Sequence, residues 1–181
     1  FSGRLSWDEI SSQCAATRSR ARGIERTNVA SCSYLRRLEP RGTESRRRWH
    51  EVTRLWLRQR AFGNRAFDVI HAVIAFAAAK KHSFARRLAN RVKRDPLLRG
   101  RSGPEELALA ERMNSAVMSF CRGDYGRAVE SIAAIRAPAH RCGGSVAQCD
   151  LIHLTLLEAA LRDRRKRLAQ TLAAERAARK P

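Results

Sequence analysis

The sequence predicts an all-α fold, built as a row of antiparallel helix pairs. Apolar residues recur at a helical spacing over most of the chain, and no stretch alternates with the period of two that marks a half-buried strand. Three helix–turn–helix units are expected, at about residues 65–94, 104–137 and 145–179. The second helix of each unit carries an alanine at the equivalent position: Ala85, Ala128 and Ala169. Their spacings of 43 and 41 residues are typical of stacked helical hairpins, none of which can bury its apolar face alone.

The first part of the chain is the least regular. Residues 17–22 are polar and basic, so we expect residues 1–28 to be a weakly ordered, basic lead-in. Residues 29–181 then form the helical domain, which is long enough to bury a core. Because the chain begins at Phe1 and not at a methionine, we expect it to be a piece of a longer polypeptide.

Two helices are expected before the first complete pair. Residues 30–39 could form a short helix that ends at Pro40, because the residue before a proline avoids the helical region. The next helix should bury one apolar face, made of Trp49, Val52 and Trp56.

The first pair begins with the most apolar stretch. Residues 66–80 are apolar nearly all round, which predicts a helix enclosed by its neighbours. After a break at residues 81–83, the partner helix has a narrower buried stripe, which consists of Phe84, Ala85, Leu88 and Val92.

The second and third pairs are marked by their ends. A loop is expected around Pro96, Gly100 and Gly103. Pro104 suits the first position of a helix that runs to about Cys121, and acidic residues behind it favour the positive end of the helix dipole. A turn at residues 123–124 leads to a helix that stops before residue 138, and the last pair spans 145–161 and 164–179.

A resemblance supports this architecture. In residues 120–129, Gly123 at the turn, Tyr125 after it and Ala128 three further on look like the core of a tetratricopeptide repeat. Residues 30 to 181 resemble the C-terminal part of the tetratricopeptide repeat protein 38 family, on residues 34–39, Trp49, 67–72, 123–125 and 140–150. The resemblance implies a right-handed α-α superhelix preceded by further helices, and it implies no reaction. Cys149 stands where the family pattern usually has arginine.

The chain carries a formal net charge of +20, and all but five of its basic residues are arginines. Such a surface attracts polyanions, nucleic acid among them, in a salt-dependent way. Alternatively, the arginines only solvate helix faces, and the sequence favours this simpler interpretation. The candidate patches are residues 18–22, 46–48 and 162–167, and the group Arg86, Arg87, Arg91 and Arg94.

Asp68 and His71 are the polar residues of the apolar stretch. Three residues apart on one helix face, they can meet as a carboxylate–imidazole pair. They could form a ligand site on the concave surface, or a satisfied buried pair that fixes packing. The second interpretation is favoured, because acid–base catalysis also needs a substrate pocket.

A second polar cluster precedes the last helix pair. Ser145 and Gln148 have the spacing of a capping box, so helix initiation explains most of the motif. The sharper hypothesis is an anion site that uses the free amides of the glycine turn and the helix N-terminus. Its members would be His140, Arg141, Gly143, Gly144, Ser145, Gln148 and Asp150. Asp150 could alternatively pair with Arg141 or with a neighbouring helix.

Neither a cofactor nor a catalytic centre is expected. The five cysteines are irregularly spaced and lack a Cys-x-x-Cys pair, which argues against both a disulfide framework and a zinc site. No serine or cysteine lies in a recognisable nucleophile motif. The absence of a signal sequence or a membrane-spanning stretch in this sequence favours a soluble cytoplasmic protein without membrane insertion.

Three functions are considered. The first, which the sequence favours, is a helical-repeat scaffold that binds a protein or peptide partner without catalysis. The second is an electrostatic nucleic-acid-binding module that uses the arginine clusters. The third is an enzyme or small-ligand site around Asp68, His71 and His140.

Overall fold

The all-α prediction is confirmed over the part of the chain that the structure describes. The computed structural model describes residues 45–58, 65–136 and 146–178. These residues form eight helices and no strand. The helices are α3 (Ser45–Arg58), α4 (Ala66–Ala78), α5 (His82–Arg94), α6 (Pro96–Arg101), α7 (Pro104–Cys121), α8 (Tyr125–Arg136), α9 (Val146–Arg162) and α10 (Lys166–Ala178). The lead-in and the short helix expected before Pro40 lie outside the described residues.

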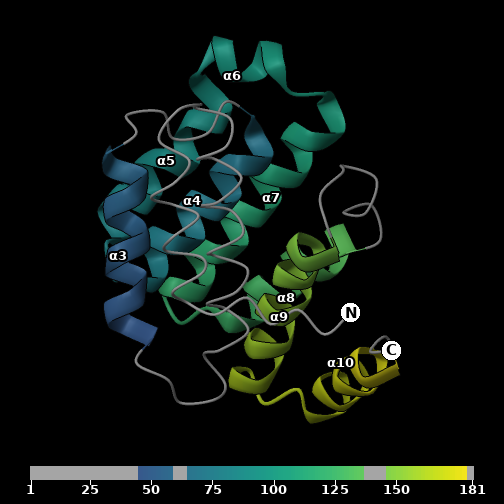
Figure 1. Cartoon of the computed structure of the whole chain (residues 1–181). Helices are drawn as coiled ribbons and strands as arrows, with labels where there is room; N and C mark the ends of the chain where they lie inside the picture. The colour runs from purple at the N-terminus through teal and green to yellow at the C-terminus, as the bar shows by residue number, and fades with distance from the viewer. Residues whose placement is uncertain (1–44, 59–64, 137–145, 179–181) are drawn as a thin grey trace, which may run out of the picture.

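The packing order follows the order of the chain. α3 packs on α4, α4 on α5 and α7, α7 on α8, α8 on α9 and α9 on α10. Figure 1 shows α3, α4, α5 and α7 gathered together, with α9 and α10 at the opposite end of the row. None of the described helices combines the length and the apolar character that crossing a membrane requires.

α4 lies at the centre of the core. Eleven of its thirteen residues are buried, because α3, α5 and α7 all pack on it. α3 contributes the three apolar residues expected from the sequence, since Trp49, Val52 and Trp56 are each at most 1% exposed. A helix that is apolar all round is stable only when its neighbours enclose it, and this prediction is confirmed.

The three helical hairpins close with the same turn. The second residue after the first helix of each hairpin has a positive φ, which is 62° at Lys80, 82° at Gly123 and 57° at Arg164. Its N–H donates to the carbonyl three residues earlier, and the next N–H donates to the carbonyl five residues earlier, over 2.8–3.2 Å. This is the Schellman arrangement, which satisfies the last carbonyl groups of a helix.

The buried alanines follow these turns at a fixed distance. Ala85, Ala128 and Ala169 each lie five residues after the residue with positive φ, and they are 0%, 0% and 4% exposed. The spacings of 43 and 41 residues therefore belong to one repeated hairpin turn. Only Gly123 marks the turn with a glycine; in the last turn, Arg164 takes that backbone conformation.

The prediction of a loop around Pro96 and Gly100 was wrong, because residues 96–101 form the short helix α6. Asp95 caps α6, its Oδ1 accepting from the N–H groups of Leu97 and Leu98 at 3.1 and 3.4 Å. Pro96 takes the first helical position, where no N–H is needed. Asp95 and Pro96 therefore start a helix at a place where proline and glycine suggested a break.

Arginine–carboxylate pairs join the last three helices. Arg136 of α8 pairs with Glu175 of α10, and Arg176 of α10 pairs with Asp150 of α9. The side chains in these pairs are 16–35% exposed, so they are partly withdrawn from solvent. α10 is thus tied by charge to both helices that precede it.

The turn before α10 uses two more arginines. Arg165 pairs with Asp163 at 2.7 Å and with Glu130 of α8 at 3.3 Å. The guanidinium of Arg162 lies 5.7 Å from the centre of the Tyr125 ring, and hydrogen bonding to the Tyr125 hydroxyl raises the pKa of Arg162. These contacts join α8 to the end of α9.

Candidate functional site

The outer face of α5 carries a row of exposed polar side chains. Ala85, Leu88 and Val92 form the buried stripe of this helix, which packs on α4 and α7. The opposite positions recur at helical spacing and are all exposed: Ser83, Arg86, Arg87, Asn90, Lys93 and Arg94. We call these six residues the α5 basic face. At 1.5 Å of rise per residue, it extends over roughly 16 Å.

The charged residues in the segment that contains this face are almost all basic. Residues 80–101 include nine lysines and arginines and a single acid, Asp95. Arg91 holds Asp95 at 2.7 Å, and hydrogen bonding from Arg91 lowers the pKa of Asp95. Because the only carboxylate of the segment is thus engaged at its end, it does not neutralise the outer face.

Three cations of the α5 basic face form no ion pair among the described residues. Arg86, Lys93 and Arg94 form no ion pair with any residue in the described ranges. Arg87 lies over the ring of Phe84, 5.1 Å from its centre. The Phe84 ring in turn stacks on the ring of Phe76 in α4, with the two ring centres 4.3 Å apart. This contact anchors the α5 basic face to the core.

A shallow, open depression of about 400 Å³ lies between α6 and α7. Its lining residues are Arg99, Ser102, Pro104, Leu107, Ala108 and Glu111. Arg99 and Glu111 approach to 3.7 Å across it. The hydroxyl of Ser102 is buried and used in the network described next, so the depression presents no nucleophile.

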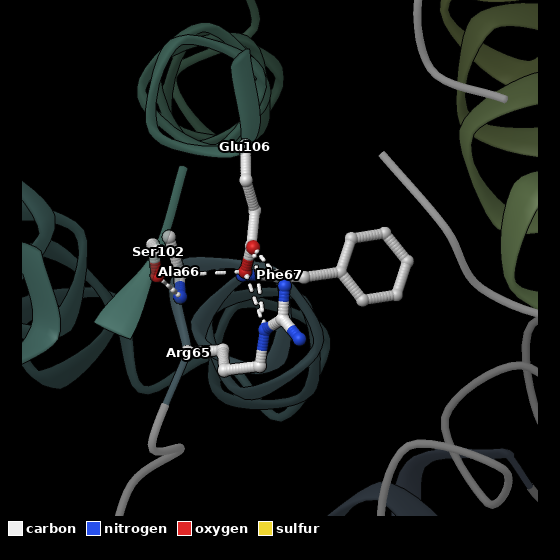
Figure 2. A network of polar contacts seen from close by, with 5 residues as sticks. All are labelled: Arg65, Ala66, Phe67, Ser102 and Glu106. Carbon is white, nitrogen blue, oxygen red and sulfur yellow. Dashed lines mark hydrogen bonds and ion pairs between the residues drawn. The ribbon is translucent and has the colours of Figure 1, made fainter. Parts of the chain in front are cut away.

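A buried polar network joins the start of α7 to the start of α4 (Figure 2). Glu106, on the first turn of α7, is 4% exposed and points at the end of α4. Its carboxylate accepts from the N–H of Phe67 at 3.0 Å and from Nη2 of Arg65 at 2.6 Å. The hydroxyl of Ser102 accepts from the N–H of Ala66 at 2.8 Å.

This network replaces a local helix cap. Arg65 occupies the N-cap position of α4 and provides no side-chain cap. The first N–H groups of a helix need acceptors, and Ser102 and Glu106 supply them from a distant part of the chain. Hydrogen bonding to Glu106 also raises the pKa of Arg65. The network therefore fixes the first hairpin against the second.

Comparison with known proteins identifies no family for this chain. No protein-family model matches it, and no solved structure matches it. Any functional conclusion therefore depends on the residues themselves.

Of the expected α4 site, His71 is fully buried at 1% exposure, whereas Asp68 is partly buried. Nδ1 of His71 lies 3.1 Å from the carbonyl oxygen of Phe67, and the two rings meet edge to face with centres 5.0 Å apart. Burial lowers the pKa of His71 to about 4, so the imidazole is neutral at pH 7. Its surroundings are those of a core side chain.

Most of the second polar cluster lies outside the described residues. These members are His140, Arg141, Gly143, Gly144 and Ser145. Gln148 lies on α9, but its side chain is outside the described part as well.

Asp150, the remaining member of that cluster, pairs with Arg176 of α10. The sequence offered Arg141 or a neighbouring helix as the partner of Asp150. The structure shows the second of these, because Arg176 lies on the neighbouring helix α10. Because His140 lies outside the described residues, a site that combines Asp68, His71 and His140 stays a hypothesis.

The described residues contain no group of side chains suited to a metal ion. Within residues 45–58, 65–136 and 146–178, no three His, Cys, Asp or Glu side chains are grouped to hold one. Burial raises the pKa of the Cys121 thiol, which keeps it protonated at neutral pH.

The sequence analysis did not identify Ser102 and Glu106 as the acceptors for the start of α4. Glu106 was expected only to favour the dipole of its own helix, and Ser102 was placed in a loop. The signal that could have found them is the uncapped start of α4, where Arg65 stands in place of a serine, threonine or aspartate.

Proposed function

We propose that this chain is a binding module for nucleic acid, which it holds electrostatically through the α5 basic face. The observation that carries the proposal is the row of exposed cations without carboxylate partners among the described residues, on a helix whose other side is packed. The +20 charge of the chain adds long-range attraction for a polyanion. No catalysis is part of this proposal.

Phosphate is the anion that this face suits best. An arginine guanidinium presents a planar set of donors that matches two phosphate oxygens at once. The face holds Arg86, Arg87 and Arg94, with Lys93 as a further point charge. Asn90 and Ser83 add neutral donors within the same row. Half or more of the hydrogen bonds in protein–DNA complexes go to the phosphates and sugars, so such a row can supply most of the affinity.

Salt dependence is the direct test. Fluorescence anisotropy with a labelled, mixed-sequence DNA would measure Kd for the intact chain at about 50 mM and about 200 mM NaCl. With four phosphates neutralised, we expect Kd to weaken by about 100-fold between the two conditions, because counterions are released on binding. Absence of binding at the lower salt, or a Kd that salt does not change, would contradict the proposal.

A second proposal concerns the helical stack as a whole. The three equivalent turns support a right-handed α-α superhelix of the tetratricopeptide kind, similar to the tetratricopeptide repeat protein 38 family. Stacked hairpins of this kind form extended concave surfaces that bind peptides or proteins. A cytoplasmic scaffold with a protein partner is therefore our second candidate. Cross-linking in a cell extract that enriches no protein over an unrelated basic control would count against it.

A further inference from the structure

We infer that the α5 basic face takes the backbone of a double-stranded nucleic acid in preference to a single strand. This inference rests on the proposed function and names the form of its ligand. The cations lie in a row on one face of α5, whose other face packs on α4 and α7, so the backbone positions that carry them are fixed before binding. The phosphates of a duplex are also fixed, at one charge per roughly 1.7 Å of axis.

A single strand would lack the contacts that normally favour it. Proteins bind single strands by stacking bases on aromatic side chains, in addition to contacting phosphates. None of the aromatic residues that the structure describes is exposed. Phe84 is the aromatic closest to the basic face in sequence, and its ring is stacked on Phe76 and covered by Arg87. A base has no platform there.

The ordering cost points the same way. A flexible strand must lose conformational freedom to align its phosphates with the row of cations, and without base stacking only the phosphate contacts offset that loss. A duplex is already ordered and has the higher charge density, so it releases more counterions per contact. The difference in affinity therefore follows from rigidity and charge together.

The test compares one duplex with its own strands. The intact chain is titrated by fluorescence anisotropy against a labelled DNA duplex of mixed sequence and about 20 base pairs. It is then titrated against each separated strand in the same low-salt buffer. We expect a lower Kd for the duplex than for either strand. A strand that binds as tightly as the duplex, or more tightly, overturns the inference and leaves the proposed function standing.

Two triple variants locate the interface. R86Q/K93Q/R94Q removes three cations of the basic face, and we expect the slope of log K against log salt to fall by about 3. R47Q/R127Q/R165Q removes three arginines that are paired with carboxylates elsewhere, and we expect it to leave the slope unchanged. Circular dichroism confirms that each variant is folded. Equal losses in the two variants overturn the assignment to α5.

The chemistry of the partner is checked by competition. Polyglutamate of similar charge is added to the complex with labelled duplex. We expect it to compete weakly, because its carboxylates are spaced along a flexible chain. Competition as strong as that of unlabelled duplex would overturn the assignment to nucleic acid and indicate an acidic protein instead. Failure of every nucleic acid to bind would overturn the proposed function itself.

Discussion

Two arginine-rich regions of this molecule use the same side chain differently. In α8 to α10, arginines meet carboxylates of neighbouring helices, as in the pairs Arg136–Glu175 and Arg176–Asp150. On the outer face of α5, Arg86 and Arg94 have no carboxylate partner among the residues that the structure describes. The paired arginines of the first region join helices, whereas the outer arginines of α5 face solvent.

The comparison shows what composition alone cannot. A net charge of +20 says nothing about which cations are neutralised by the fold. Residues 80–101 hold nine lysines and arginines and one acid, and Arg86, Lys93 and Arg94 among them form no ion pair with a described residue. Charge that the fold does not use is the charge that can attract a ligand, and this reasoning selects the α5 basic face.

The largest effect is expected at the buried carboxylate of Glu106, which is paired with Arg65. Replacing Glu106 by alanine removes the acceptor of the Phe67 N–H and the partner of Arg65. Because a buried donor loses its hydrogen bond, we expect a loss of roughly 3 kcal/mol in the free energy of unfolding. Thermal unfolding followed by circular dichroism should show a midpoint lower by roughly 6–12 °C.

A neighbouring residue provides the control for this prediction. Glu105 lies beside Glu106 on the first turn of α7, but its side chain is exposed. Glu105→Ala should change the midpoint by no more than about 2 °C, since it removes only a weak interaction with the helix dipole. Equal shifts in the two variants would mean that the buried network does not stabilise the fold.

The next largest effect depends on pH. Burial holds the pKa of His71 at about 4 in the folded chain, below its ordinary value of 6.5. As the pH falls, the His71 imidazole therefore takes up a proton in the unfolded chain before it does so in the folded chain. The stability that neutral His71 allows is fully present above pH 6.5 and declines as the pH falls toward 4. We expect this group to remove roughly 3 kcal/mol of stability across that interval.

Urea denaturation at a series of pH values tests the histidine prediction. His71→Leu keeps an apolar side chain of similar size and removes the titrating group. The wild-type chain should lose stability more steeply than this variant below pH 6.5. Parallel curves for the two proteins would rule out His71 as the source of the acid sensitivity.

Much of the fold could be predicted from the sequence, because it depends on local periodicity. The stripe Trp49, Val52 and Trp56 and the alanines after each turn follow directly from spacing. The turns were harder to place, since Lys80 and Arg164 adopt positive φ without being glycine. α6 was missed because its stability depends on one cap and on Leu98, which is buried against the rest of the protein.

The candidate site was only partly predictable. Arg86, Arg87 and Arg94 lie in one of four basic patches, and no local sequence feature distinguishes that patch from the other three. The choice depends on pairs between residues far apart in the chain, such as Arg165 with Glu130. Contacts of this kind are set by tertiary packing, which no local pattern encodes.

A smaller effect is expected for an interhelical pair of α10. Arg176 and Asp150 are 25% and 16% exposed, so solvent screens their attraction only in part. A double-mutant cycle with Arg176→Gln, Asp150→Asn and the double variant should give a coupling of about 1 kcal/mol. The free energies of unfolding come from urea denaturation of the four proteins. A coupling of zero would remove the structural role assigned to this arginine.

The smallest effect is expected on α5, and it separates the two regions most clearly. R86Q/K93Q/R94Q replaces three exposed cations that pair with no acid among the described residues. Such surface changes usually alter stability by less than about 0.5 kcal/mol each, and reduced repulsion along the helix offsets part of any loss. The unfolding midpoint should therefore stay within about 2 °C of the wild type. A fall as large as that caused by Arg176→Gln would mean that the α5 cations also hold the fold together. An unchanged midpoint combined with weaker DNA binding would show that the α5 cations serve binding. The paired arginines of α8 to α10 would then be the cations that serve folding.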